Sequence, residues 1–224
     1  MPILSILKVN KIKEFKKGDK LIIPKQTDLQ PQVRTDVSIP RTTIEVIEAT
    51  NNFYKFKIRQ EGDTKRKPIK LLWEKFEEII DYEKGWQEIF YFEGRYDKPN
   101  SELILFCDDS NTKTLLERLD KSDIDADTTE FDLVKLRRTK SFRIWGIWGK
   151  VNSVHIAKKG IFGYDLGEEK EIKDEDITAL DVNFKIDGED ISMVISKNGR
   201  IFSHNKIPIN KLYEFYLGIR DGAY

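Results

Sequence analysis

The sequence predicts a β-rich α+β protein, with a small β-barrel or sheet and one amphipathic helix in the first half and an antiparallel β-meander closed by a helix in the second. Three observations favour this class. Short segments are rich in β-branched and aromatic residues, turn residues recur at regular intervals, and two apolar patterns have helical spacing.

The first half predicts three strands followed by a helix. The expected strands are Leu21–Pro24, Thr42–Ala49 and Phe53–Gln60. Thr50–Asn52 has turn composition, so the second and third strands should form a hairpin. Pro68 then opens a series of apolar residues at i, i+3, i+4 and i+7, which predicts an amphipathic helix over residues 68–80.

The middle of the chain predicts two strands, a short helix and an acidic connector. In order, these are Glu88–Glu93, Glu102–Cys107, Asn111–Leu119 and Asp120–Glu130. The connector has little apolar surface to bury, so we expect it to be exposed.

The second half predicts strands separated by glycine-containing turns. The expected strands are Phe131–Arg138, Ser141–Trp148, Val151–Lys158, Ile161–Tyr164, Ile177–Ile186, Ile191–Ser196 and Arg200–Ser203. Asp187-Gly188 and Asn198-Gly199 are typical two-residue hairpin turns. Ile209–Ile219 has one apolar face and should form a helix that caps this sheet. We therefore expect a β-rich domain with a helix over residues 1–95, a linking segment over 96–130, and a C-terminal sheet domain over 131–224.

Composition narrows the functional classes. The 224 residues include 39 Lys or Arg and 39 Asp or Glu, so the chain is formally neutral and resembles neither a polycation nor an acidic tail. A single cysteine, Cys107, excludes an internal disulfide framework and is compatible with a reducing cytoplasm. No apolar stretch is long enough for a membrane helix. We expect a cytoplasmic protein with no membrane span and no cofactor.

Catalytic motifs are weak. His155 and His204 lie in no recognisable nucleophile motif, and Cys107 ends an apolar strand, where a buried thiol is expected. Asp123, Asp125 and Asp127 imitate the start of a calcium loop without its glycine and its closing glutamate.

One enzymatic alternative stays open. A Mg²⁺-dependent nuclease could use Glu171 and Lys173 on one face of a strand, with Asp165 upstream.

The most informative segment is basic and aromatic. Residues 133–164 contain eight Lys or Arg and no carboxylate, whereas residues 165–190 contain eleven Asp or Glu. Cations neutralise phosphates and aromatic rings stack on unpaired bases, so this segment predicts a face for single-stranded nucleic acid. Alternatively, the basic block pairs with the acidic block, with both tryptophans in the core. The candidate binding residues are Lys135, Arg137, Arg138, Lys140, Arg143, Trp145, Trp148, Lys150, Lys158 and Lys159.

Two resemblances concern the fold. The polar Asp174–Asp176 segment before an apolar strand, a hairpin and one closing helix resemble bacterial pleckstrin-homology-like domains, and Phe15–Asp19 with the following hairpin is similar to SH3-like barrels. Both resemblances imply a ligand surface, and the first would suit an anionic headgroup.

Our leading hypothesis is a non-catalytic intracellular binding protein that acts through its sheet surfaces on a protein partner or a second copy. Nucleic-acid binding through residues 133–159 is the alternative, and the nuclease is a further one.

Overall fold

A computed structural model describes most of the chain. The described residues are 3–24, 41–65, 68–73, 76–82, 86–119, 122–139, 143–150, 158–163, 166, 171–186 and 188–223, without the side chains of 63–87, 186 and 223.

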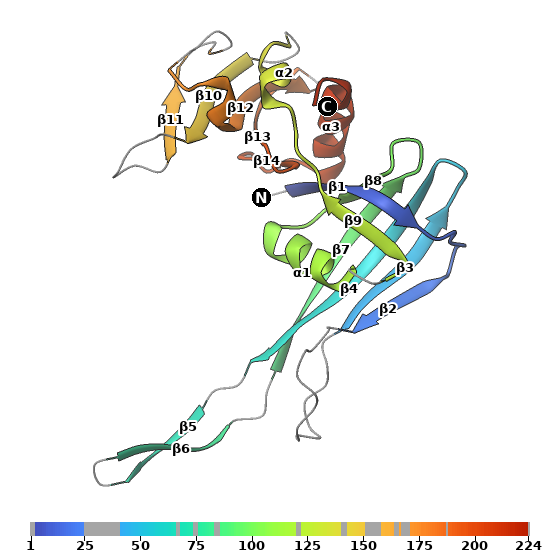
Figure 1. Cartoon of the computed structure of the whole chain (residues 1–224), viewed down its shortest axis with the longest axis vertical. Helices are drawn as coiled ribbons and strands as arrows, with labels where there is room; N and C mark the ends of the chain where they lie inside the picture. Colours follow the sequence, from blue (N-terminus) through green and yellow to red (C-terminus); the bar gives the residue numbers. More distant parts are fainter. Residues whose placement is uncertain are drawn as a thin grey trace.

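One large antiparallel sheet organises the described residues (Figure 1). Its strands run in the order β11-β10-β12-β13-β14-β1-β8-β7-β4-β3-β2, and β9 also pairs with β1. The strand bounds are β1 Ile3–Ile12, β2 Lys20–Pro24, β3 Arg41–Ala49, β4 Phe53–Lys65, β7 Trp86–Asp97, β8 Glu102–Leu105, β9 Ile124–Thr128, β10 Arg143–Lys150, β11 Lys158–Phe162, β12 Ile177–Ile186, β13 Glu189–Ser196 and β14 Arg200–Ser203. Its two edge strands do not pair with each other, so the described sheet is open and is not a closed barrel.

Strand β1 lies in the middle of this sheet and is buried on both faces. Leu4 and Ile6 join one hydrophobic core, whereas Leu7 and Val9 join a second core on the opposite face. Because side chains of a strand alternate between faces, β1 contributes to both cores at once.

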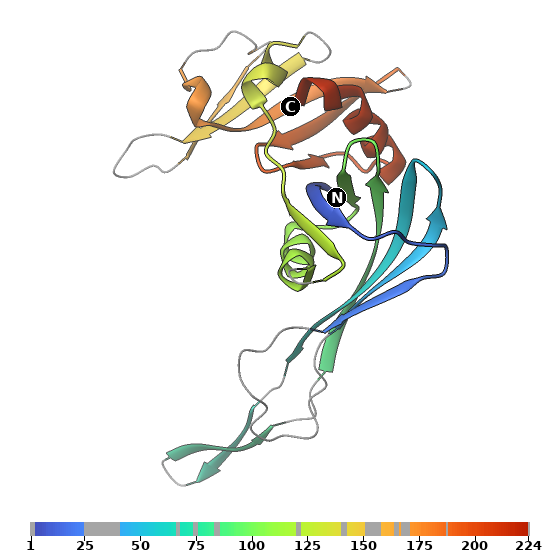
Figure 2. The same ribbon diagram turned by 45° about the vertical axis from the view of Figure 1, so that its right-hand side comes forward.

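Helices cover the two cores on opposite sides of β1. Helices α2 (Leu133–Arg137) and α3 (Ile209–Ala223) pack on the first core, and α1 (Asp109–Leu119) packs on the second. Figures 1 and 2 both show α3 and α1 on opposite sides of the β1 strand. Among the described residues, no helix therefore covers the other face of the C-terminal strands.

The predicted β-rich α+β class is confirmed. All three expected strands of the first half are present, and the turn at residues 50–52 joins β3 to β4. The C-terminal meander and its closing helix are also present, with β12 and β14 at the predicted bounds. The expected strand over residues 151–158 lies mostly outside the described residues.

The helix predicted over residues 68–80 is wrong. The chain there forms a hairpin of β5 (Pro68–Trp73) and β6 (Phe76–Tyr82), with Trp73 opposite Phe76. Short apolar runs do not distinguish a buried helix from a strand, and this segment has the aromatic and isoleucine content of strands.

The strand predicted over Phe131–Arg138 is also wrong, because residues 133–137 form α2. The side chain of Asp132 accepts a hydrogen bond from the backbone nitrogen of Lys135 at 2.9 Å. Such an N-cap satisfies an otherwise unpaired donor of the first helical turn. Lys135 and Arg137 therefore do not share one face of a strand.

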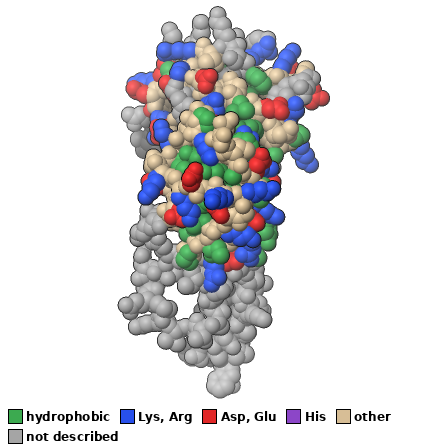
Figure 3. All heavy atoms as spheres, turned by 90° about the vertical axis from the view of Figure 1, so that its right-hand side faces the viewer, with side chains coloured by type: hydrophobic (Ala, Val, Ile, Leu, Met, Phe, Trp, Pro, Cys, Tyr) green, Lys and Arg blue, Asp and Glu red, His purple; other side chains and the backbone are tan. Residues whose placement is uncertain are grey.

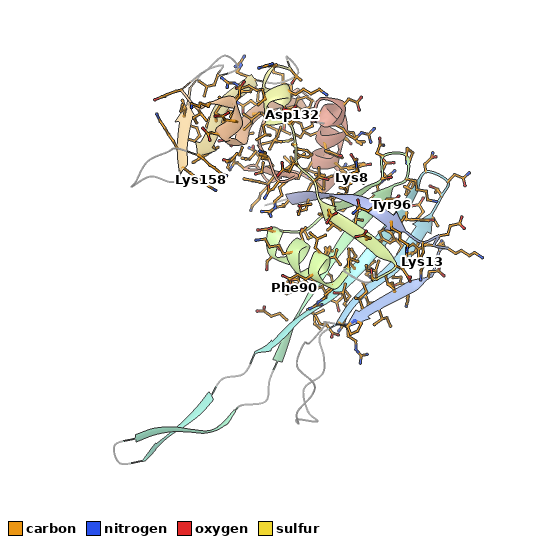
Figure 4. The ribbon with its side chains drawn as sticks, viewed as in Figure 1. Lys8, Lys13, Phe90, Tyr96, Asp132 and Lys158 are labelled. Atoms are coloured by element: carbon orange, nitrogen blue, oxygen red, sulfur yellow. The ribbon has the colours of Figure 1, made fainter. Side chains whose placement is uncertain are left out.

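The predicted connector contains a strand that was not expected. Residues 124–128 form β9, which pairs with β1. Lys8 lies opposite Asp127 and Lys11 opposite Asp125, and Lys13 forms an ion pair with Asp123. Figure 4 shows Lys8 on β1 and Lys13 just beyond the end of this strand. Cross-strand register thus places these carboxylates beside lysines of the N-terminal segment, and Asp127 Oδ2 also accepts a hydrogen bond from Asn10 Nδ2 at 2.7 Å.

The predicted boundaries at residues 95/96 and 130/131 stay a prediction, and β7 continues across the first of them. In the described part of the chain, no helix combines the length and the apolar character that crossing a membrane requires.

Gly199 allows β14 and β9 to meet along the same edge of β1. Its φ is +72°, and a Cβ atom there would lie 2.8 Å from the carbonyl oxygens of both Ile6 and Thr129. Gly188, in the β12–β13 turn, has a similar φ of +86° but open space around it.

We expect Gly188→Ala to lower the free energy of unfolding by about 1–2 kcal/mol, the cost of a left-handed alanine. Gly199→Ala should cost a further ~1–3 kcal/mol, because the methyl group displaces backbone. Urea unfolding of both variants measures the difference, and equal losses would contradict the close packing at Gly199.

Candidate functional site

The helix-free face of the C-terminal strands is the candidate site. We call it the open face. Its side chains come from four neighbouring strands and are Trp148, Ala179, Asp181, Val194, Ser196, Arg200, Phe202 and His204. Alternate residues of the same strands, such as Leu180, Val182 and Ile195, lie in the first core. The alternation of the strands thus separates a structural face from an accessible one.

Register places these residues in two rows across the sheet. One row runs through Phe162, Gly146, Asp181, Val194 and Phe202. The adjacent row runs through Gly160, Trp148, Ala179, Ser196 and Arg200. Aromatic rings therefore lie at both sides of the face, with small residues between them.

Two glycines make room for the aromatic rings. A Cβ atom on Gly146 would lie 2.6 Å from Asp181 Oδ2 and 2.9 Å from the Phe162 ring. A Cβ atom on Gly160 would lie 2.9 Å from Phe162 and 3.0 Å from Trp148. The Trp148 and Phe162 rings meet edge to face at 5.1 Å, and their residues stay 38% and 49% exposed.

Asp181 is the unusual polar group of the open face. The residue is 2% exposed, and its Oδ2 accepts a hydrogen bond from Trp148 Nε1 at 2.7 Å. Its Oδ1 is buried without a hydrogen-bond partner, and His204 Nε2 lies 3.6 Å away. Leaving a buried acceptor unpaired is costly, so this carboxylate oxygen needs an explanation beyond packing.

The open face is hollowed into a cavity of about 520 Å³. Its volume falls in the range of small-molecule sites, which is roughly 300–1,000 Å³. Its lining includes the cationic side chains Lys158, Lys197 and Arg200 and the carboxylates Glu130 and Asp181. Arg200 also forms an ion pair with Asp109 at the start of α1, which joins the open face to the second core.

The sequence-predicted residues divide between this cavity and other places. Trp148 and Lys158 line the cavity, and half-buried Trp145 packs on Phe162 with ring centroids 5.5 Å apart. Exposed Lys150 lies opposite Lys158 on the neighbouring strand, and Arg143 begins β10. Lys140 lies outside the described residues. Figure 4 shows Lys158 at β11, away from Asp132 at α2.

The remaining basic residues pair with the acidic block. Arg137 Nη1 lies 3.2 Å from Asp174 Oδ1, and Arg138 Nη2 lies 3.3 Å from Asp174 Oδ2. Lys159 forms an ion pair with Glu171, and Lys135 Nζ donates to the backbone oxygen of Asp221. Part of the predicted basic face is therefore neutralised within the molecule.

Arg137 and Arg138 share a partner but differ in burial, since their side chains are 5% and 73% exposed. Arg137 Nη2 also donates to the carbonyl oxygen of Leu166 at 3.4 Å. We expect Arg137→Met to lower the free energy of unfolding by about 2 kcal/mol, because it removes charged hydrogen bonds from a buried site.

The control, Arg138→Met, should cost less than ~0.5 kcal/mol, since an exposed ion pair contributes little. Thermal melts of the two variants measure both effects. Equal destabilisation would show that Arg137 contributes no more than a surface charge.

The nuclease residues are not arranged as expected. Glu171 and Lys173 are exposed and precede the 3₁₀ turn η2 (Asp174–Asp176), so the strand predicted for them is wrong. Asp165 and His155 lie outside the described residues. Among the residues with described side chains, no three His, Cys, Asp or Glu are grouped so that they could hold a metal ion.

Cys107 is buried, and its Sγ lies 3.4 Å from Thr112 Oγ1. Burial raises the pKa of this thiol to about 12. Because the thiolate is the reactive form, we expect no measurable alkylation by iodoacetamide at pH 8 in the folded protein. Alkylation in urea should be fast, and mass spectrometry compares the two; rapid labelling without urea would contradict the burial.

Sequence reasoning missed most of the cavity, including Asp181, Phe202 and His204. A signal was present for one of them: Asp181 interrupts the apolar run of β12, and a charged residue inside a buried strand needs a partner or a function. The alternation Ser192, Val194, Ser196 also indicated a strand face with small residues.

In comparisons with known proteins, the chain matches no family model, and the search of curated proteins gives no match.

Proposed function

We propose that the protein is a non-catalytic binding protein that acts through its open face, and that its ligand is single-stranded nucleic acid. The observation that carries this proposal is the cavity that exposed Trp148 lines together with Lys158, Lys197 and Arg200. Arg200 also pairs with Asp109, and Lys197 Nζ lies 4.0 Å from Glu130 Oε2. Unpaired bases stack on aromatic rings, and cations neutralise the backbone phosphates.

A sheet with helices on one face and aromatic rings on the other suits this function. Single strands bind to such faces because their bases splay out and stack on the rings. Lys150 and Lys158 lie directly opposite each other on β10 and β11. Two like charges in that position are unfavourable for the sheet, and an anion between them removes the repulsion.

Charge on another face of the molecule does not favour a long polyanion. In Figure 3, Lys or Arg and Asp or Glu side chains are interspersed over the described part of the surface shown. A local contact at the open face fits the neutral formal charge better than a footprint that surrounds the molecule.

We expect labelled twelve-nucleotide single strands to bind, and their affinity to fall as salt rises, because counterions are released on binding. Trp148→Ala should weaken binding about tenfold, the loss of one stacked base. Lys158→Glu should weaken binding and reduce the salt dependence. Fluorescence anisotropy at low and physiological salt measures all three effects.

The matched controls are Tyr91→Ala, an exposed aromatic residue on β7, and Lys17→Glu in the turn before β2. Both should leave the affinity unchanged, and circular dichroism checks that all four variants are folded. Absence of binding to any single strand at either salt would remove this proposal.

A protein partner or a second copy remains a second candidate. Exposed Ile89 and Tyr91 are two residues apart on β7 and so share one face of the strand, and neighbouring apolar residues at a surface favour protein contact. Light scattering over a range of protein concentrations tests self-association. The cytoplasmic location also stays a proposal, supported by the single cysteine.

A further inference from the structure

We propose that the cavity of the open face takes a guanine base, with Asp181 as the group that reads it. This inference rests on the proposed function, because it names the base that the same face prefers. It starts from Asp181 Oδ1, a buried acceptor in the cavity wall that has no hydrogen-bond partner and lies 3.6 Å from His204 Nε2.

Asp181 is built as a fixed acceptor. Trp148 Nε1 donates to its Oδ2 at 2.7 Å and so holds the plane of the carboxylate, while Oδ1 has no hydrogen-bond partner. The residue is 2% exposed, so water does not solvate this oxygen freely. A ligand that donates a hydrogen bond to Oδ1 removes the cost of an unpaired buried acceptor.

A carboxylate distinguishes guanine from the other bases. The Watson–Crick edge of guanine carries two adjacent donors, N1–H and the N2 amino group, and both can reach one carboxylate. In adenine, cytosine and uracil, each donor on that edge lies beside an acceptor, which the carboxylate repels. Oδ2 of Asp181 can accept a second hydrogen bond in addition to the one from Trp148 Nε1. The two carboxylate oxygens can therefore accept from the N1–H and N2 amino groups of one guanine.

The surrounding side chains suit a planar base with a phosphate. The aromatic rings of Trp148 and Phe202 line the cavity, and the small residues Ala179 and Ser196 lie between them in the sheet. His204 lies over Oδ1, and its side chain is 49% exposed, so the ring can turn toward solvent when a base enters. Lys158 and Lys197, which also line the cavity, can contact the phosphate group attached to the base.

The same cationic lining argues against a cationic ligand such as a lysine or arginine side chain. Such a ligand would also pair with Asp181, but Lys158, Lys197 and Arg200 in the same cavity would repel it. A guanine nucleotide has a neutral base edge that donates hydrogen bonds to the carboxylate and a phosphate that interacts with the cations.

The test compares free nucleotides on the unmodified protein. Guanosine monophosphate should bind at least about tenfold more tightly than inosine monophosphate, which differs by the missing N2 amino group. Adenosine, cytidine and uridine monophosphates should be weaker still. Quenching of tryptophan fluorescence or calorimetry measures these affinities.

A second experiment tests the base within an oligonucleotide. It compares the affinity for a twelve-nucleotide oligouridine with the affinity for the same oligonucleotide carrying one central guanine. Asp181→Asn should abolish the preference for guanine in both experiments, since one oxygen becomes a donor. The matched control, Asp190→Asn, changes an exposed carboxylate on β13 and should keep the preference. A thermal melt of Asp181→Asn checks folding; if that variant fails, the nucleotide comparison on the unmodified protein decides.

The outcomes separate this inference from the proposed function. If strands bind with salt dependence but guanine has no advantage, the base assignment is wrong and nucleic-acid binding stands. If only the guanine-containing strand binds and the free nucleotide does not, the ligand is a strand. If a lysine- or arginine-containing peptide binds in preference to guanosine monophosphate, the assignment is overturned. If no strand and no nucleotide binds, both proposals fail.

Discussion

Burial of β1 on both faces is the constraint on which the rest of the structure depends. Leu4 and Ile6 need one apolar layer and Leu7 and Val9 need another, so the chain must supply a core on each side of the same strand. Helix α3 closes one core and α1 closes the other. Because each core covers a different half of the sheet, the C-terminal strands have helices on one face and an accessible surface on the other.

Ion pairs within the molecule explain why the many charged residues of this chain do not by themselves define the candidate site. The lysines of β1 face the aspartates of β9, and Asp174 pairs with both Arg137 and Arg138. The contacts of Asp174 neutralise part of the basic and acidic blocks inside the molecule. Asp181 is different, because it is buried with one oxygen hydrogen-bonded to an indole and the other, which lies 3.6 Å from His204 Nε2, without a hydrogen-bond partner. The candidate site is thus defined less by total charge than by a single carboxylate among aromatic rings.

The sequence predicts most of the C-terminal half, since its strands are short and its turns contain Asp-Gly and Asn-Gly pairs that act locally. The sequence does not predict the pairing of β1 with β9. The lysines of one strand and the aspartates of the other match only when two segments more than 110 residues apart are placed side by side. The helix predicted over residues 68–80 is wrong because the spacing of apolar residues alone does not distinguish a helix from a strand in this segment. For the site, composition found Trp148 and Lys158, but Asp181 and His204 are brought to them by sheet register, which no local pattern encodes.

The position of β1 also has a consequence for the order of folding. Residues 3–5 are synthesised before their partners in β14, which follow almost two hundred residues later. Until then, one hydrogen-bonding edge of β1 has no native neighbour along those residues. Contacts so distant in sequence slow folding, and open strand edges are where nascent chains associate with one another. A chaperone that holds the first strand during synthesis would therefore protect the whole sheet.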